Sequence, residues 1–247
     1  MPKWLQRTLI ALLAVVVILA VVVGIYAQPL SAQVAALEAI RGSATVTVTN
    51  DASQIVLAPK AASNKGLIFY QGAKVAPEAY GVALLEVAEA GYTVFVPKMP
   101  LNFAVLNAAA AKTIIDTHPD ITAWAIAGHS LGGAMACSYA KDDPRVTVLI
   151  FWAAYCDQSF DLSANPSIAV TSISGALDGL ATPAKVQGTK MYAPPSTVYV
   201  SIAGMNHAQF GDYGAQSGDN PATISPSQAT QRVIAVTLEA LAKLKAK

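Results

Sequence analysis

The chain has 247 residues, of which 54% are hydrophobic, and its formal net charge is +1. This near-neutral charge, without a basic cluster, argues against a nucleic-acid-binding surface. The sequence contains no H-E-x-x-H, no Cys/His cluster and no G-x-G-x-x-G after a strand, so we expect neither a metal nor a dinucleotide cofactor.

The first predicted element is an apolar helix. Residues 9–27 carry no charge and follow Lys3 and Arg7. About 19 apolar residues can cross the bilayer core as a helix, whereas the apolar region of a cleaved signal peptide has about 7–15. Ile25-Tyr26-Ala27 lacks the second small residue of a good cleavage site, so an uncleaved signal anchor is favoured over secretion after cleavage. Because the positive residues precede the span, the rest of the chain is expected on the extracytoplasmic side.

The sequence therefore divides into three parts. Residues 1–28 form the cytoplasmic N-terminus and transmembrane signal anchor, and residues 29–43 form a tether with a short helical piece at 32–40. Residues 44–247 are long enough for one domain with a substantial core.

Within the domain, a strand at 44–49 that alternates with period two and a strand at 54–58 predict an antiparallel hairpin. Apolar strands then alternate with helices, which predicts a mostly parallel central sheet with helices on both faces. We expect these further strands at 66–70, 92–96, 121–127, 146–153, 168–174 and 197–202. We expect helices at 77–90, 103–117, 131–141, after 182–183, and at 226–244.

The motif that carries chemistry is Gly128-His129-Ser130-Leu131-Gly132, which lies between a predicted strand and a helix of small residues. This is G-x-S-x-G in the strand–turn–helix context that exposes a nucleophilic serine. Gly128 and Gly132 relieve crowding beside the sharp turn. The N–H of Leu131, at the helix N-terminus, can point at a developing oxyanion. A chance Gly-Ser-Gly turn is the alternative.

On these residues the chain resembles the α/β-hydrolases over about residues 44–247. Within that superfamily it is similar to the compact serine hydrolases of the dienelactone hydrolase-like group. The resemblance implies an α/β-hydrolase fold and a serine nucleophile. Dienelactone hydrolases themselves use a cysteine where this chain has Ser130, so their lactone activity is not carried over.

A nucleophilic serine needs a histidine base, which in turn needs an orienting acid. In this fold the chain order is serine, acid, histidine. Asp178 follows the strand before last and His207 follows the last strand, so they are the predicted acid and base. Asp157 and Asp161 are competing acids, and His129 is expected to line the elbow.

The second oxyanion donor is expected in the loop after the 66–70 strand, from the N–H of Gly72 or Ala73. For the aromatic residues near the carboxyl ends of the strands, core packing and a substrate pocket are equally good explanations. The candidate pocket residues there are Lys74, Met99, Trp152 and Phe210. The loop at 209–220 is either a mobile rim or a solvated loop.

The sequence thus predicts a serine hydrolase that cleaves small carboxylic esters through an acyl-enzyme. A thioesterase, an amidase or an acyltransferase on the same machinery remains open, as does a catalytically silent binding module. The expected partners are a small ester substrate and, through the N-terminal helix, the membrane, with no nucleic acid; the sequence does not indicate an oligomeric state.

The connection at 154–167 is too short for a multi-helix cap, so we expect a shallow site that prefers acyl groups of about two to six carbons. Cys137 and Cys156 either form a disulfide or remain buried free thiols.

Overall fold

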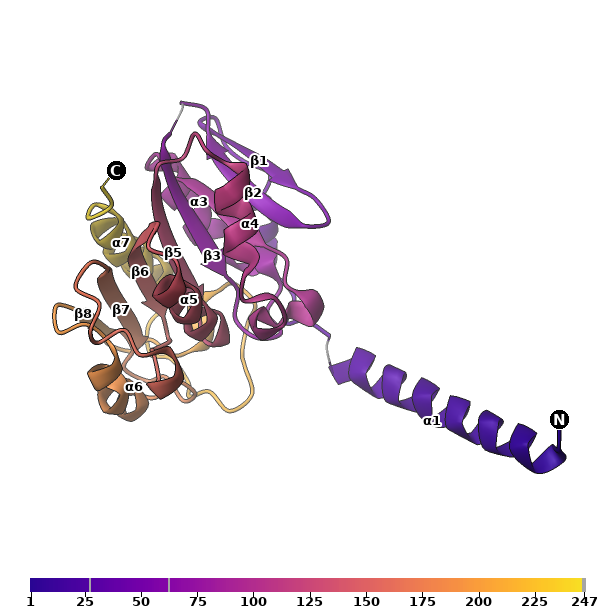
Figure 1. Ribbon diagram of the computed structural model, residues 1–247. Coiled ribbons are helices and arrows are strands. Elements are labelled where there is room, and N and C mark those ends of the chain that lie inside the picture. The colour runs from indigo at the N-terminus through magenta and orange to yellow at the C-terminus, as the bar shows by residue number, and fades with distance from the viewer. Residues whose placement is uncertain (27, 62, 246–247) are drawn as a thin grey trace.

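The computed structural model describes residues 1–26, 28–61 and 63–245, and within them an eight-stranded sheet forms the centre of the molecule (Figure 1). The strand order is β1-β2-β4-β3-β5-β6-β7-β8. β2 pairs antiparallel with β1 and with β4. All the other neighbouring strands in this order, from β4 with β3 to β7 with β8, pair in parallel. The strands are β1 (Val46–Asn50), β2 (Gln54–Pro59), β3 (Lys65–Tyr70), β4 (Thr93–Pro97), β5 (Ala123–His129), β6 (Val146–Trp152), β7 (Ala169–Gly175) and β8 (Val198–Ile202). Every predicted strand is therefore observed, with shifts of a few residues at the ends.

Helices cover both faces of this sheet, because the central strands have apolar side chains on both sides. The helices are α1 (Lys3–Tyr26), α2 (Val34–Ala39), α3 (Gly81–Glu89), α4 (Ala110–Thr117), α5 (Leu131–Asp142), α6 (Pro183–Thr189) and α7 (Pro226–Leu241). Leu67 and Phe69 of β3 join a core cluster with α3 and α7, whereas Ile68 and Tyr70 of the same strand join a second cluster with α4 and α5.

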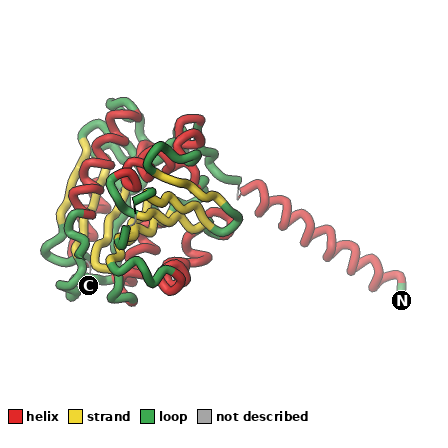
Figure 2. Tube along the Cα trace, turned by 90° about the horizontal axis from the view of Figure 1, so that it is seen from above, coloured by secondary structure: helices red, strands yellow, loops and turns green. Residues whose placement is uncertain are grey.

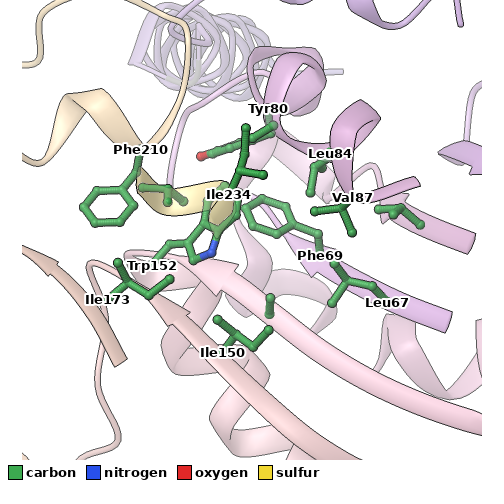
Figure 3. Close-up of a cluster of buried hydrophobic side chains, with 14 of the residues drawn as sticks. Leu67, Phe69, Tyr80, Leu84, Val87, Ile150, Trp152, Ile173, Phe210 and Ile234 are labelled. Atoms are coloured by element: carbon green, nitrogen blue, oxygen red, sulfur yellow. The ribbon is translucent and has the colours of Figure 1, made fainter. Parts of the chain in front are cut away.

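Aromatic side chains fill the centre of the first cluster (Figure 3). Trp152 is fully buried, and its ring lies 4.7 Å from that of Phe69 and 6.4 Å from those of Tyr80 and Phe210. Its indole N–H donates to Thr237 of α7 at 3.0 Å. This contact fastens the end of β6, beside the predicted elbow, to the covering helix.

The helix predicted at 103–117 begins differently from the expectation, whereas the last helix begins as predicted. The helix predicted at 103–117 is regular only from Ala110, and 3-10 turns at Pro100–Asn102 and Ala104–Asn107 precede it. Leu101 and Asn102 have φ values of 51° and 59°, which no regular right-handed helix accommodates. The last helix begins as predicted, because Ser225 and Gln228 form a reciprocal capping box.

The segment predicted as a tether packs on the domain instead. Leu30 forms a parallel bridge with Val75, and its N–H donates to the carbonyl of Lys74 at 2.6 Å. In α2, Ala36 is fully buried, and its N–H donates to the carboxylate of Asp212 at 3.2 Å. Residues 28–43 are therefore an integral part of the fold rather than a free connection.

By contrast, α1 projects away from the α/β domain (Figures 1 and 2). It has 24 residues, which correspond to roughly 36 Å at about 1.5 Å per residue. Among the described residues it is the one helix long and apolar enough to cross a bilayer, by length and composition.

The connection between β6 and β7 is short and contains, among the described residues, a single 3-10 turn at Gln158–Phe160. The expected absence of a multi-helix cap is therefore confirmed. Cys156, in the same connection, forms a disulfide with Cys137 of α5, so the two thiols are not free.

Candidate active site

The predicted elbow is a strained turn between β5 and α5. Ser130 has φ 53° and ψ −124°, a conformation that is uncommon for a residue with a side chain. A Cβ at Gly128 would lie 2.5 Å from the backbone of Gly132, and a Cβ at Gly132 would lie 2.3 Å from the carbonyl oxygens of Tyr70 and Gln71. Both positions therefore require glycine.

The helix after the elbow supplies a hydrogen-bond donor beside the serine. Leu131 is the first residue of α5, so its N–H has no partner within the helix, and the N-terminal end of the helix carries a partial positive charge. The N–H of Ser130 donates to the carbonyl of Trp152 at 2.9 Å, which fixes the turn to β6. This geometry suits the stabilisation of negative charge next to Ser130.

The structure brings the predicted acid and base together. Nδ1 of His207 lies 2.8 Å from Oδ2 of Asp178, and both side chains are buried. The other carboxylate oxygen of Asp178 accepts from the N–H groups of Leu180 and Ala181 at 2.8 and 2.7 Å. The carboxylate is thus held in one orientation. The contact between this carboxylate and Nδ1 of His207 favours the histidine tautomer that is protonated at Nδ1, which leaves Nε2 as an acceptor.

His207 and Ser130 are not joined by a hydrogen bond in this structure. Nε2 of His207 is buried and makes no hydrogen bond within the described part of the chain, and Ser130 is half-buried. In hydrolases without substrate this bond is often long and shortens in the complex. The two competing acids have other partners, because Asp157 and Asp161 accept from the nearby N–H groups of Ser159 and Ser163.

Hydrogen bonds in the loop after β3 distinguish between Gly72 and Ala73, the two candidates for the second oxyanion donor. The N–H of Gly72 donates to the hydroxyl of Tyr80 at 2.9 Å, so the prediction of Gly72 as a donor is wrong for this structure. The N–H of Ala73 makes no hydrogen bond within the described residues. The close approach of Gln71 to Gly132 shows that this loop passes the start of α5, so Ala73 remains the candidate.

Tyr80 is a buried residue of the site that the sequence did not reveal. Its hydroxyl accepts from Gly72 and lies 2.9 Å from Nδ1 of His129. A tyrosine hydroxyl has one proton, so donation to Nδ1 satisfies all three groups and leaves the proton of His129 on Nε2. Burial, and next the charge of His207, hold the pKa of His129 well below 6.5. His129 is therefore neutral beside His207, whose ring centroid lies 4.6 Å away.

Asp219 is a second residue that the sequence did not single out. One of its carboxylate oxygens accepts from the N–H of Gly179 at 2.9 Å, and the other accepts from the N–H of Ala208 at 2.8 Å. These donors follow Asp178 and His207 directly in the chain, so Asp219 joins the loop that contains Asp178 to the loop that contains His207. The loop at 209–220 is consequently tied to the site. Nothing in the spacing of Asp219 signals this role.

Three of the four predicted pocket residues belong to the core. Met99, Trp152 and Phe210 are all less than 5% exposed and pack in the two apolar clusters. Strand alternation turns Trp152 towards α7, which explains why it does not line a pocket. Lys74 is half-buried in the loop after β3, with φ 63°. Among the residues that the structure describes, no three His, Cys, Asp or Glu side chains gather closely enough to hold a metal.

The comparison with known families agrees with this architecture. The alpha/beta hydrolase family matches residues 66–231, and the chain belongs to that family. No curated protein sequence matches the chain.

Several solved structures share the fold at low sequence identity. The Thermogutta terrifontis esterase Est2 with bound butyrate superposes with a TM-score of 0.57 at 11% identity, over 81% of this chain and 94% of that chain. Est1E from Butyrivibrio proteoclasticus with bound ferulic acid gives 0.57 at 16% identity, over 80% and 97%. A dienelactone hydrolase candidate from Klebsiella pneumoniae gives 0.56 at 14% identity, over 80% and 98%.

Proposed function

We propose that the protein is a serine hydrolase that cleaves small carboxylic esters, with Ser130 as nucleophile, His207 as general base and Asp178 as the acid that orients it. The observation that carries the proposal is the buried 2.8 Å contact between Asp178 and His207, combined with a serine on a strained elbow at the start of α5. The esterases of similar fold, one with bound butyrate and another form phosphorylated by paraoxon, support the same class of chemistry.

In the first step, Nε2 of His207 takes the proton of the Ser130 hydroxyl while the oxygen attacks the acyl carbon. The carbonyl oxygen of the substrate becomes an oxyanion, which the N–H groups of Leu131 and Ala73 stabilise. His207 then gives the proton to the leaving alcohol as the ester C–O bond breaks, and an acyl-serine remains. In the second step, water attacks this acyl group with His207 again as the base, which releases the acid and restores Ser130.

The neutral state of His129 serves this cycle. His207 becomes positively charged in both steps, and a second charge on the neighbouring ring would oppose that change. Burial lowers the pKa of His129 and so keeps this neighbouring ring uncharged. Thioester hydrolysis, amide hydrolysis and acyl transfer use the same steps with another leaving group or acceptor and remain alternatives, as does a catalytically silent binding module.

We also propose that α1 is retained as a membrane anchor and that the domain lies on the extracytoplasmic side. The length and composition of α1 support the anchor, and the disulfide fits an oxidising compartment. Secretion after signal cleavage is the alternative. Intact-mass measurement of the mature chain distinguishes them, because a chain that begins near Gln28 would refute the anchor.

The test of the hydrolase is steady-state kinetics on p-nitrophenyl butyrate with purified full chain in detergent. We expect Ser130→Ala and His207→Ala each to lower kcat by about 10⁴-fold or more while the far-UV circular dichroism spectrum stays unchanged. Turnover by Ser130→Ala at the wild-type rate would refute the proposed nucleophile.

A further inference from the structure

Exposed apolar side chains gather near the end of α1. Outside residues 1–26, the described chain exposes seven large apolar side chains, namely Val34, Leu37, Leu101, Val105, Leu106, Met191 and Val198. Two of them lie on α2, which follows α1 in the chain, and three lie on the 3-10 turns at 100–107. These last three, Leu101, Val105 and Leu106, are each more than half exposed and are called the apolar rim below.

Short connections hold the apolar rim close to the point where α1 ends. Leu30 follows Tyr26, the last residue of α1, by four positions, which span at most about 14 Å when fully extended. The N–H of Leu30 donates to the carbonyl of Lys74, and the N–H of Lys74 donates to the carbonyl of Asn102 at 2.9 Å. Asn102 is the neighbour of Leu101. The 3-10 turns that carry the apolar rim and the end of α1 are therefore on the same side of the domain, as the ribbon in Figure 1 also shows.

The backbone beneath the apolar rim is fixed, so its exposed side chains are not those of a loose loop. The side-chain oxygen of Asn102 accepts from Gln71 at 3.1 Å, and the hydroxyl of Tyr70 donates to the carbonyl of Ala108 at 2.8 Å. Leu101 has φ 51°, a conformation that disfavours a bulky side chain. A bulky apolar residue is thus held exposed at a position that a glycine or asparagine would occupy more easily.

The apolar rim also adjoins the candidate active site. Gln71 and Lys74, which contact Asn102, flank Gly72 and Ala73 in the oxyanion loop. Whatever covers the apolar rim therefore lies beside this loop.

We propose that the apolar rim inserts into the bilayer leaflet next to the end of α1 and holds the active site at the lipid–water boundary. This proposal rests on the anchor and hydrolase proposed above. The anchor leaves only a few residues between the bilayer and Leu30, so the leaflet is the apolar phase that the rim meets first. The substrate class that fits this placement is an amphiphilic ester that lies in the membrane with its ester group at the boundary.

Site-specific fluorescence tests the insertion directly. The two cysteines of the chain are joined in the disulfide, so Leu106→Cys introduces a unique free thiol for an NBD label. The labelled full chain is reconstituted in phosphatidylcholine vesicles that contain nitroxide lipids. Met191→Cys is the matched control, because Met191 is also exposed but lies between α6 and β8, and β8 is five strand positions from β4, the strand before the apolar rim. We expect blue-shifted and strongly quenched emission at position 106 and little quenching at 191. Equal, weak quenching at both positions would overturn the proposal.

A kinetic comparison tests the consequence for the substrate. The combined variant Leu101→Ser, Val105→Ser and Leu106→Ser is compared with Met191→Ser and Val198→Ser. The readout is the ratio of the rate on a vesicle-embedded lipid ester to the rate on soluble p-nitrophenyl butyrate. We expect the rim variant to lower this ratio about tenfold, because it removes most of the apolar area that inserts, and the control to leave it unchanged. An unchanged ratio in the rim variant would contradict the placement.

The controls separate failure of this proposal from failure of the underlying ones. If the wild-type protein is purified without residues 1–27, both the anchor and the apolar-rim proposal are refuted. Strong quenching at position 106 without turnover of either ester would support the insertion and refute the hydrolase.

Discussion

Tyr80→Phe is the most informative change near the site, because it removes one hydroxyl and leaves the aromatic ring in place. Tyr80 is 1% exposed, and its hydroxyl contacts two groups at 2.9 Å, the N–H of Gly72 and Nδ1 of His129. Leaving a buried polar group unpaired costs about 1–3 kcal/mol each. For two groups, we therefore expect the free energy of unfolding to fall by about 2–6 kcal/mol. We also expect kcat to fall about tenfold, because the oxyanion loop loses its attachment.

Tyr70→Phe is the matched control for this variant. The hydroxyl of Tyr70 also joins two backbone groups at 2.8 Å, the carbonyl of Ala108 and the N–H of Ala111, but on the opposite face of the sheet. Urea denaturation should show a comparable loss of stability in both variants, and p-nitrophenyl butyrate kinetics should show a fall in kcat for Tyr80→Phe alone. Wild-type stability of Tyr80→Phe, or an equal fall in kcat for both variants, would refute this reasoning.

Four further predictions follow from the site. Asp178→Ala should lower kcat by about 10³–10⁴-fold while Asp157→Ala keeps the wild-type rate; the reverse result would reassign the acid. Because the pKa of His129 is lowered in the folded chain, the unfolded chain binds more protons below pH 6.5, and the free energy of unfolding should decrease there by at most about 1.4 kcal/mol per pH unit. Urea denaturation of His129→Asn from pH 7.5 to 5 should show a shallower decrease, and an unchanged slope would count against a buried neutral imidazole. Asp219→Ala should lower the free energy of unfolding by about 1–3 kcal/mol and also lower kcat, because the N–H groups of Gly179 and Ala208 lose their acceptor; an unchanged kcat would show that the two loops hold their geometry without it. On p-nitrophenyl esters of increasing length, kcat/KM should peak at about two to six acyl carbons, and a steady rise to twelve or sixteen carbons would indicate an apolar channel.

The sheet and the elbow were predictable because their signals are local. Continuous apolar runs such as 121–127 are typical of strands buried on both faces, and the structure buries every residue of β5. Gly128 and Gly132 could be interpreted from the motif because the sharp turn leaves no room for a Cβ.

The features that the sequence did not predict depend on partners far away in the chain. The 29–43 segment reads as a tether because its contacts, with Lys74 and Asp212, are invisible to local patterning. Gly72 seemed a free donor because its acceptor is the side chain of Tyr80, which only the fold brings into place. Trp152 seemed a pocket residue because a strand end says nothing about which helix covers that face.

The central claim is that Ser130 is a nucleophile activated within this fold, and covalent trapping tests it most directly. The purified full chain is incubated with a fluorophosphonate, digested, and analysed by peptide mass spectrometry. We expect a single phosphonyl adduct on the peptide that contains Ser130, and no adduct in Ser130→Ala or after denaturation. An adduct on a different residue, or no adduct on the folded wild-type chain that binds to vesicles, would contradict the account.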